Sequence, residues 1–208
     1  MDFEAERLGA IAKSNRKVEF KSGMSEFEVS EKEYVSTLQS PDLFCGMVLQ
    51  TYCGLVEEHA RDVLRELNQI GIEVLPLLDS KYHSFYEKID HFPPPNGIED
   101  WGEKILSLVN RSWDDVVPGK AKIVEVIVVR NALAHGTPEV TKRMLNRLAG
   151  VGGTLPWKEG TKIKLSYDSV KDYRDRLRSF ARVLSDATAE SICVHEIAQK
   201  KSGRGLKK

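Results

Sequence analysis

The stretch Ile123–His135, with the sequence IVEVIVVRNALAH, decides the fold of this chain. Its β-branched residues are typical of a buried strand. However, the apolar run continues as far as Ala134, which is long for a strand, and Gly136 follows at a position where helices commonly end. We therefore expect a helix over residues 121–135 that is apolar almost all round.

The rest of the chain predicts an all-α fold, a bundle of short and long helices. Apolar residues recur at helical spacing over residues 42–69, where Ser40-Pro-Asp supplies the start signal and Gly71 the stop. We expect Gly46 and Gly54 inside this helix to allow the close approach of another helix. Further helices are expected over residues 80–89, 99–115, 137–148 and 170–197, with a short strand or hairpin edge over Thr161–Ser166 before the last of them.

The chain divides into three regions. Residues 1–39 form an N-terminal extension, in which we expect NRKVEFKSG to be an extended connector and Ser30-Glu-Lys-Glu33 to cap a short helix. Residues 40–197 form the helical domain. Residues 198–208 are basic, and we expect them to be disordered.

Composition bounds the classes of protein to consider. Lys+Arg and Asp+Glu both number 31 in 208 residues, so the total charge neither supports nor excludes a nucleic-acid partner. The beginning, MDFEAERLGA, lacks the apolar region of a signal peptide, and no apolar run reaches the roughly 18 residues of a membrane span. We expect a cytoplasmic protein with no membrane partner.

Cysteine and histidine do not predict a metal centre. Cys45, Cys53 and Cys193 lie in periodic apolar segments without CxxC spacing, so we expect buried thiols. The five histidines form no HExxH motif and no cluster with cysteine. We therefore expect neither a bound metal nor another cofactor.

Three polar residues, Arg130, Asn131 and His135, stand in the apolar stretch, where a polar group without a partner would cost a few kcal/mol. On a helix Asn131 and His135 share a face, about 40° apart, while Arg130 is about 140° from His135. The long arginine side chain can wrap toward that face. The three residues either pair with neighbouring helices for structural reasons or form a site.

The run Arg130-Asn131-Ala-Leu-Ala-His135 resembles the R-N-x-x-x-H signature of HEPN domains. These are helical domains, many of them metal-independent ribonucleases of toxin–antitoxin, abortive-infection and RNA-processing systems. The order of elements over roughly residues 40–195 is similar to the RiboL-PSP-HEPN-like branch. One departure is Thr137, where HEPN toxins that pair with nucleotidyltransferase antitoxins commonly carry tyrosine, so inactivation by nucleotide transfer onto that residue is not supported.

The resemblance implies a HEPN-like helical bundle and a metal-independent endoribonuclease, acting on tRNA or mRNA as a toxin or antiphage-defence effector. It also implies a homodimer with a composite site, in which Arg130, Asn131 and His135 are catalytic, and an antitoxin or defence-system protein as a further partner. The residue chemistry agrees, because histidine can transfer protons near neutral pH. Arginine presents a fork of donors to phosphate oxygens, and asparagine can orient the histidine or contact phosphate. The apolar helix itself also points to a dimer, since it buries more surface than one small bundle face needs.

Weaker candidates surround this set. Lys142, Arg143 and Arg147 could hold RNA phosphates or form an ordinary solvated face. Glu57 and Glu58 could support the site or form an acidic face of the long helix. Two other functions stay open, a non-catalytic HEPN binding or assembly module and a helical regulatory domain whose polar set is only structural.

Overall fold

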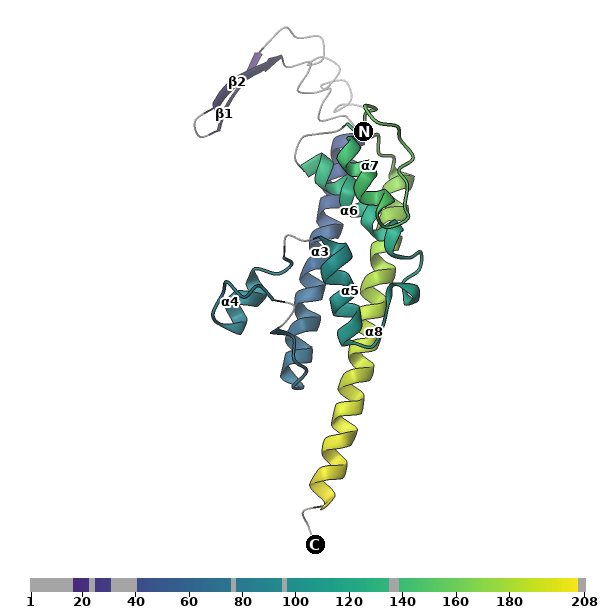
Figure 1. Ribbon diagram of the computed structural model, residues 1–208. Coiled ribbons are helices and arrows are strands. Elements are labelled where there is room, and N and C mark those ends of the chain that lie inside the picture. The colour runs from purple at the N-terminus through teal and green to yellow at the C-terminus, as the bar shows by residue number, and fades with distance from the viewer. Residues whose placement is uncertain are drawn as a thin grey trace, which may run out of the picture.

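The computed structural model describes residues 17–22, 25–30, 41–75, 78–94, 97–134 and 139–205. Two long helices, α3 (Pro41–Gln69) and α8 (Tyr167–Gly205), lie side by side and form the frame (Figure 1). The expected all-α bundle is confirmed. Its other helices are α4 (Phe85–Asp90), α5 (Ile98–Leu108), α6 (Lys120–Ala134) and α7 (Lys142–Ala149).

The central element is α6, which contacts α3, α5, α7 and α8. Every residue from Ile123 to Val129 is buried. Because other helices surround α6, its β-branched residues pack on all sides, and this tertiary burial outweighs their preference for strands. The prediction of a helix here is confirmed. No helix in the described part of the chain is both long enough and apolar enough to span a bilayer.

The end of α3 was correctly predicted. Gly71 takes a left-handed conformation with φ 83°, and the Ile72 N–H donates to the Leu67 carbonyl over 3.0 Å. This is the Schellman arrangement, which satisfies carbonyls that would otherwise be left open at a helix end.

The predicted helix over residues 99–115 was wrong in length. It stops at Leu108 because Asn110 adopts φ 55°, and the Arg111 N–H bonds to the Leu106 carbonyl over 2.8 Å. This is again the Schellman arrangement, and asparagine is one of the few residues that can take the place of glycine in it. The chain then forms the short 3-10 helix η2 (Trp113–Asp115).

Gly102 on α5 is the glycine that admits a close neighbour. A Cβ atom there would lie 2.7 Å from the ring of Trp113, which itself stacks on Phe180 of α8. The role expected for Gly46 and Gly54 is not observed. At Gly46 the nearest atom is Leu133 at an ordinary 3.7 Å, and at Gly54 the described residues leave the space open.

Other element boundaries also differ from the predictions. Helix α4 begins at Phe85, after the N-cap Ser84, and α7 begins at Lys142, after the N-cap Thr141. The strand expected over Thr161–Ser166 is reduced to one isolated bridge between Glu139 and Lys162. The predicted ends were shifted because capping side chains, rather than the apolar pattern, set the first turn of each helix.

The two ends of the chain were predicted less well than its middle. The expected connector is a two-stranded antiparallel hairpin, β1 (Lys17–Ser22) with β2 (Ser25–Ser30), in which Phe20 lies opposite Phe27. Helix α8 continues through Gly205, into the basic tail for which we expected disorder. The short helix expected after Ser30 lies outside the described residues.

Gly102→Ala should lower the free energy of unfolding by about 1–3 kcal/mol, because the added methyl group forces Trp113 out of its stack. Gly54→Ala is the matched control and should raise stability by about 0.5–1 kcal/mol, since alanine favours the helix and meets nothing. Urea unfolding followed by circular dichroism measures both. Equal stabilisation of the two variants would contradict the tight Gly102–Trp113 contact.

Candidate active site between α3 and α6

Arg130 and Asn131 lie side by side near the end of α6. Nη1 of Arg130 donates to Oδ1 of Asn131 over 3.0 Å, and Nη2 forms an ion pair with Glu57 of α3. The side chains of Arg130 and Glu57 are 23% and 25% exposed. The Arg130 side chain is therefore mostly buried at the α3–α6 junction but keeps part of its surface in contact with solvent.

Helix geometry explains why these groups meet. Leu133 lies near Gly46 and Arg130 near Glu57, so α6 and α3 run antiparallel at their contact. The arginine side chain is long enough to wrap toward the face that carries Asn131, as the sequence predicts. Its Nε is buried and has no hydrogen-bond partner among the described residues. A buried donor without a partner costs free energy, and this one is closed to solvent, so it faces the core and not the candidate site.

Cys53 of α3 lies close to Arg130 and Glu57 and is 1% exposed. Burial raises the pKa of its thiol to about 11, because the opposing effect of Arg130 is smaller. The thiol is therefore protonated and unreactive near neutral pH. Cys45 is buried as expected, whereas Cys193 is exposed on α8, contrary to the prediction.

His135, Gly136 and Thr137 lie outside the described residues. The description of α6 ends at Ala134, immediately before the histidine. The structure thus brings together Arg130, Asn131 and Glu57 and leaves the third signature residue as a prediction.

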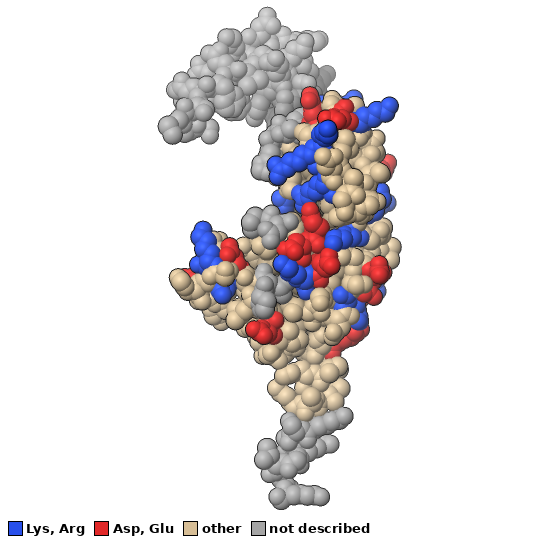
Figure 2. Space-filling view, viewed as in Figure 1, with Lys and Arg blue, Asp and Glu red and all other residues tan. Residues whose placement is uncertain are grey.

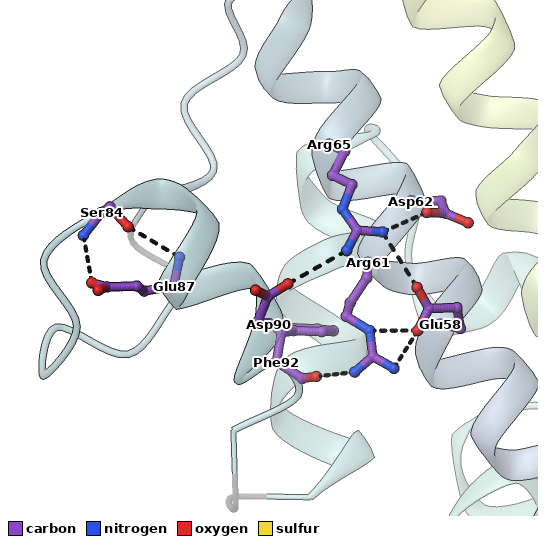
Figure 3. A network of polar contacts seen from close by, with 8 residues as sticks. All are labelled: Glu58, Arg61, Asp62, Arg65, Ser84, Glu87, Asp90 and Phe92. Atoms are coloured by element: carbon purple, nitrogen blue, oxygen red, sulfur yellow. Dashed lines mark hydrogen bonds and ion pairs between the residues drawn. The ribbon is translucent and has the colours of Figure 1, made fainter.

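Glu58 does not join this group, although it follows Glu57 in sequence. It accepts hydrogen bonds from Arg61 and Arg65, and the first of these contributes most to lowering the pKa of its carboxyl group. Arg61 also donates to the Phe92 carbonyl over 2.7 Å, and Arg65 lies 3.8 Å from Asp90 (Figure 3). Glu58 belongs to a network that ties the α4 segment to α3.

The three basic residues of α7 have two different environments. Arg147 binds Glu99 of α5 through a two-pronged contact, with Nε to Oε1 and Nη2 to Oε2 both at 2.7 Å. Lys142 and Arg143 are exposed, and neither forms a hydrogen bond or ion pair through its side chain with the described residues. Only the latter two are available to a phosphate group.

Glu125 is a buried polar residue that the sequence analysis did not single out. Its carboxylate accepts from Lys122 over 2.9 Å and from Tyr173 over 3.3 Å, and it lies 3.1 Å from Arg176 of α8. Burial, with the nearby carboxylate, raises the pKa of the Tyr173 hydroxyl group. The one available signal was an acidic residue inside the run IVEVIVV.

The described residues contain no group of three or more His, Cys, Asp or Glu side chains that could hold a metal ion. Comparison of the chain with protein-family models, with curated proteins and with solved structures gives no match. The chemistry of the candidate site is therefore argued from its own geometry. A partly exposed guanidinium can bind an oxyanion such as phosphate, which at this site would have to displace the carboxylate of Glu57.

Arg147→Ala should lower the free energy of unfolding by about 1–2 kcal/mol at pH 7, since it removes two charge-assisted hydrogen bonds. Burial opposes ionisation of Glu99, but the bonds from Arg147 outweigh it and keep the pKa of this carboxyl group below its usual range. A lowered folded-state pKa contributes stability above the unfolded pKa, and this contribution is lost as the pH falls through the folded pKa. The difference between wild type and variant should therefore shrink below about pH 4.

Lys142→Ala is the control for this measurement and should change stability by less than about 0.5 kcal/mol at any pH. Urea unfolding curves at several pH values would give both results. A loss for Arg147→Ala that stays constant with pH would show that the pair with Glu99 does not carry the effect.

Proposed function

We propose that this chain is a HEPN-type endoribonuclease that cleaves tRNA or mRNA without a metal ion, in the cytoplasm, as a toxin or antiphage-defence effector. The observation that supports this most is the position of Arg130. Its guanidinium is fixed beside Asn131 at the open edge of the α3–α6 junction, five residues before the histidine of the signature. An antitoxin or another defence protein would be the regulator.

The reaction follows from these side chains. His135 would take the proton from a ribose 2′-hydroxyl group, and the 2′-oxygen would attack the adjacent phosphorus. Arg130 would stabilise the charge on the non-bridging oxygens. The 5′-oxygen would then leave with a proton from a second histidine, giving a 2′,3′-cyclic phosphate and a 5′-hydroxyl end. Asn131 positions Arg130 through the hydrogen bond to its Nη1.

The Arg130–Glu57 ion pair is the observation that favours a different function. With this pair closed, the positive charge of Arg130 is compensated inside the chain. The second candidate is therefore a non-catalytic HEPN binding or assembly module, in which the pair only joins α3 to α6. In the nuclease, an incoming phosphate would have to take over the guanidinium from Glu57.

A homodimer would supply the second histidine, and α3 offers a surface for it. The apolar run of α6 does not, because it is covered within its own chain. On α3 by contrast, Phe44, Met47 and Leu55 are 55%, 61% and 60% exposed. They recur at helical spacing along α3, the helix that also carries Glu57, so this face is the one offered to a second copy.

His135→Ala should reduce RNA cleavage by about 10²-fold or more, since it removes the proton-transfer group. Arg130→Ala should abolish cleavage, and Arg130→Lys should restore it only in small part, because an ammonium group cannot make the two-pronged contact. Wild-type cleavage should persist in EDTA and leave 2′,3′-cyclic ends. Gel analysis of labelled tRNA and mRNA fragments measures all of these.

Thermal melting separates catalysis from folding in this series. Arg130→Lys keeps a cation beside Glu57 and should melt close to wild type, whereas Arg130→Ala leaves Glu57 without its partner and should lose about 1–2 kcal/mol. If the lysine and His135 variants melt like wild type and cleave as fast, the residues are not catalytic. Cleavage that requires Mg²⁺ and leaves 5′-phosphate ends would also reject the nuclease proposal.

The wild-type chain should be a dimer at micromolar concentration, and Met47→Glu with Leu55→Glu should make it monomeric. Both positions are exposed, so the substitutions should leave the fold intact while placing like charges against each other across the interface. Light scattering measures the mass. Tyr86→Glu is the control, since Tyr86 is 76% exposed and lies on α4, not on α3. A wild-type monomer would argue against the composite site.

A further inference from the structure

A basic surface lies where the chain enters α7. The Val140 N–H donates to the Thr161 carbonyl over 2.9 Å, and the Gly160 N–H donates to the Val140 carbonyl over 2.8 Å. These two bonds fold the turn at residues 158–161 onto the segment that immediately precedes α7. Residues separated by about twenty positions in sequence therefore share one surface.

The segment after this turn directs its lysines outward. Ile163 and Leu165 are 1% and 4% exposed, so the alternating residues Lys162 and Lys164 face away from the core. The backbone of Leu165 is held by Asp42 at the start of α3, whose Oδ1 accepts its N–H over 3.2 Å. Lys162 and Lys164 thus belong to a segment whose backbone is fixed by this hydrogen bond and by two buried side chains.

We define the α7 basic surface as five exposed cations from this region: Lys142, Arg143, Lys158, Lys162 and Lys164. None of them forms an ion pair with the part of the chain that the structure describes. Two carboxylates, Glu139 and Glu159, lie in the same segment, so positive charge is in excess. Figure 2 shows Lys and Arg side chains at the end of the molecule where α7 lies, with acidic side chains among them.

The α7 basic surface and the candidate site are close along the chain. Ala134, at the end of α6, and Glu139, which bridges to Lys162, are five residues apart. Five residues of fully extended chain span at most about 18 Å. A nucleic acid of a few nucleotides could therefore touch both the end of α6 and the surface.

We infer that the α7 basic surface binds the sugar–phosphate backbone of single-stranded RNA and leads that strand to Arg130. This inference rests on the proposed function, because it supplies the substrate path for the nuclease. A single strand fits better than a duplex on chemical grounds. Attack by the 2′-oxygen in line with the leaving 5′-oxygen needs a backbone free to leave the A-form geometry.

The test uses the full chain and a fluorescent single-stranded RNA of mixed sequence whose 2′-positions are O-methylated, so that it cannot be cleaved. The variant carries Lys158→Gln, Lys162→Gln and Lys164→Gln. The control carries Lys104→Gln, Arg182→Gln and Lys200→Gln, which replace three exposed cations on α5 and α8. The two variants therefore have the same net charge. Fluorescence anisotropy over a series of salt concentrations gives affinity and its salt dependence.

The surface variant should lose about tenfold or more in affinity. The plot of log K against log salt should become shallower by about 2, since each of the three lost contacts with a single strand contributes about 0.7 to the magnitude of its slope. The control should bind like wild type. Equal losses in both variants, or no loss in the surface variant, would overturn the inference. So would equal affinity for a duplex of the same strand.

Failure of the nuclease proposal gives a different result. If unmodified RNA binds through these lysines yet stays intact, or is cut equally by wild type and His135→Ala, the α7 basic surface stands and the proposed catalysis falls. If wild type cuts RNA in a His135-dependent way while the surface variant binds and cuts normally, the proposed catalysis stands and the inferred path is wrong.

Discussion

The bundle depends on the burial of α6, a helix with no solvated face between Ile123 and Val129. Such a helix is stable only when neighbours cover it on every side, and α3, α5, α7 and α8 do so. The hydrophobic effect that drives this arrangement has no direction of its own. Burial also requires a partner for each polar group on α6, because a buried polar group without one costs free energy.

Arg130 meets this demand in a way that bears on both candidate functions. Its partner is Glu57 on α3, and both side chains keep about a quarter of their surface in contact with solvent. A fully buried pair would be costly to open, whereas a partly exposed one can exchange its carboxylate for another anion at lower cost. The same contact can therefore join two helices when no ligand is present and receive a phosphate group when one arrives.

Sequence reasoning succeeded where the signal is periodic or local. The long helices follow from apolar spacing, and the end of α3 follows from Gly71. It failed where an ordinary residue takes a special conformation, as Asn110 does when it ends α5 early. It also failed where a partner is remote in sequence. Nothing near Arg147 indicates that Glu99 will occupy its guanidinium.

The candidate site was predictable to a similar extent. The pairing of Arg130 with Asn131 follows from helical geometry and the length of the arginine side chain. The choice between the adjacent residues Glu57 and Glu58 does not, because it depends on the rotation of α3 against α6. That rotation turns Glu57 toward Arg130 and leaves Glu58 to Arg61 and Arg65.

The carboxylate of Glu125 has a consequence for the uniqueness of the native state. A helix that is apolar on all sides could shift along its axis or rotate between its neighbours and still bury nearly the same area. Glu125 must meet Arg176 and Tyr173 on α8, while Arg130 must meet Glu57 on α3. Two polar residues five positions apart, directed at two different helices, are satisfied together at a single translation and a single rotation of α6. The two charged residues thus favour one packing of α6 over others of similar apolar burial.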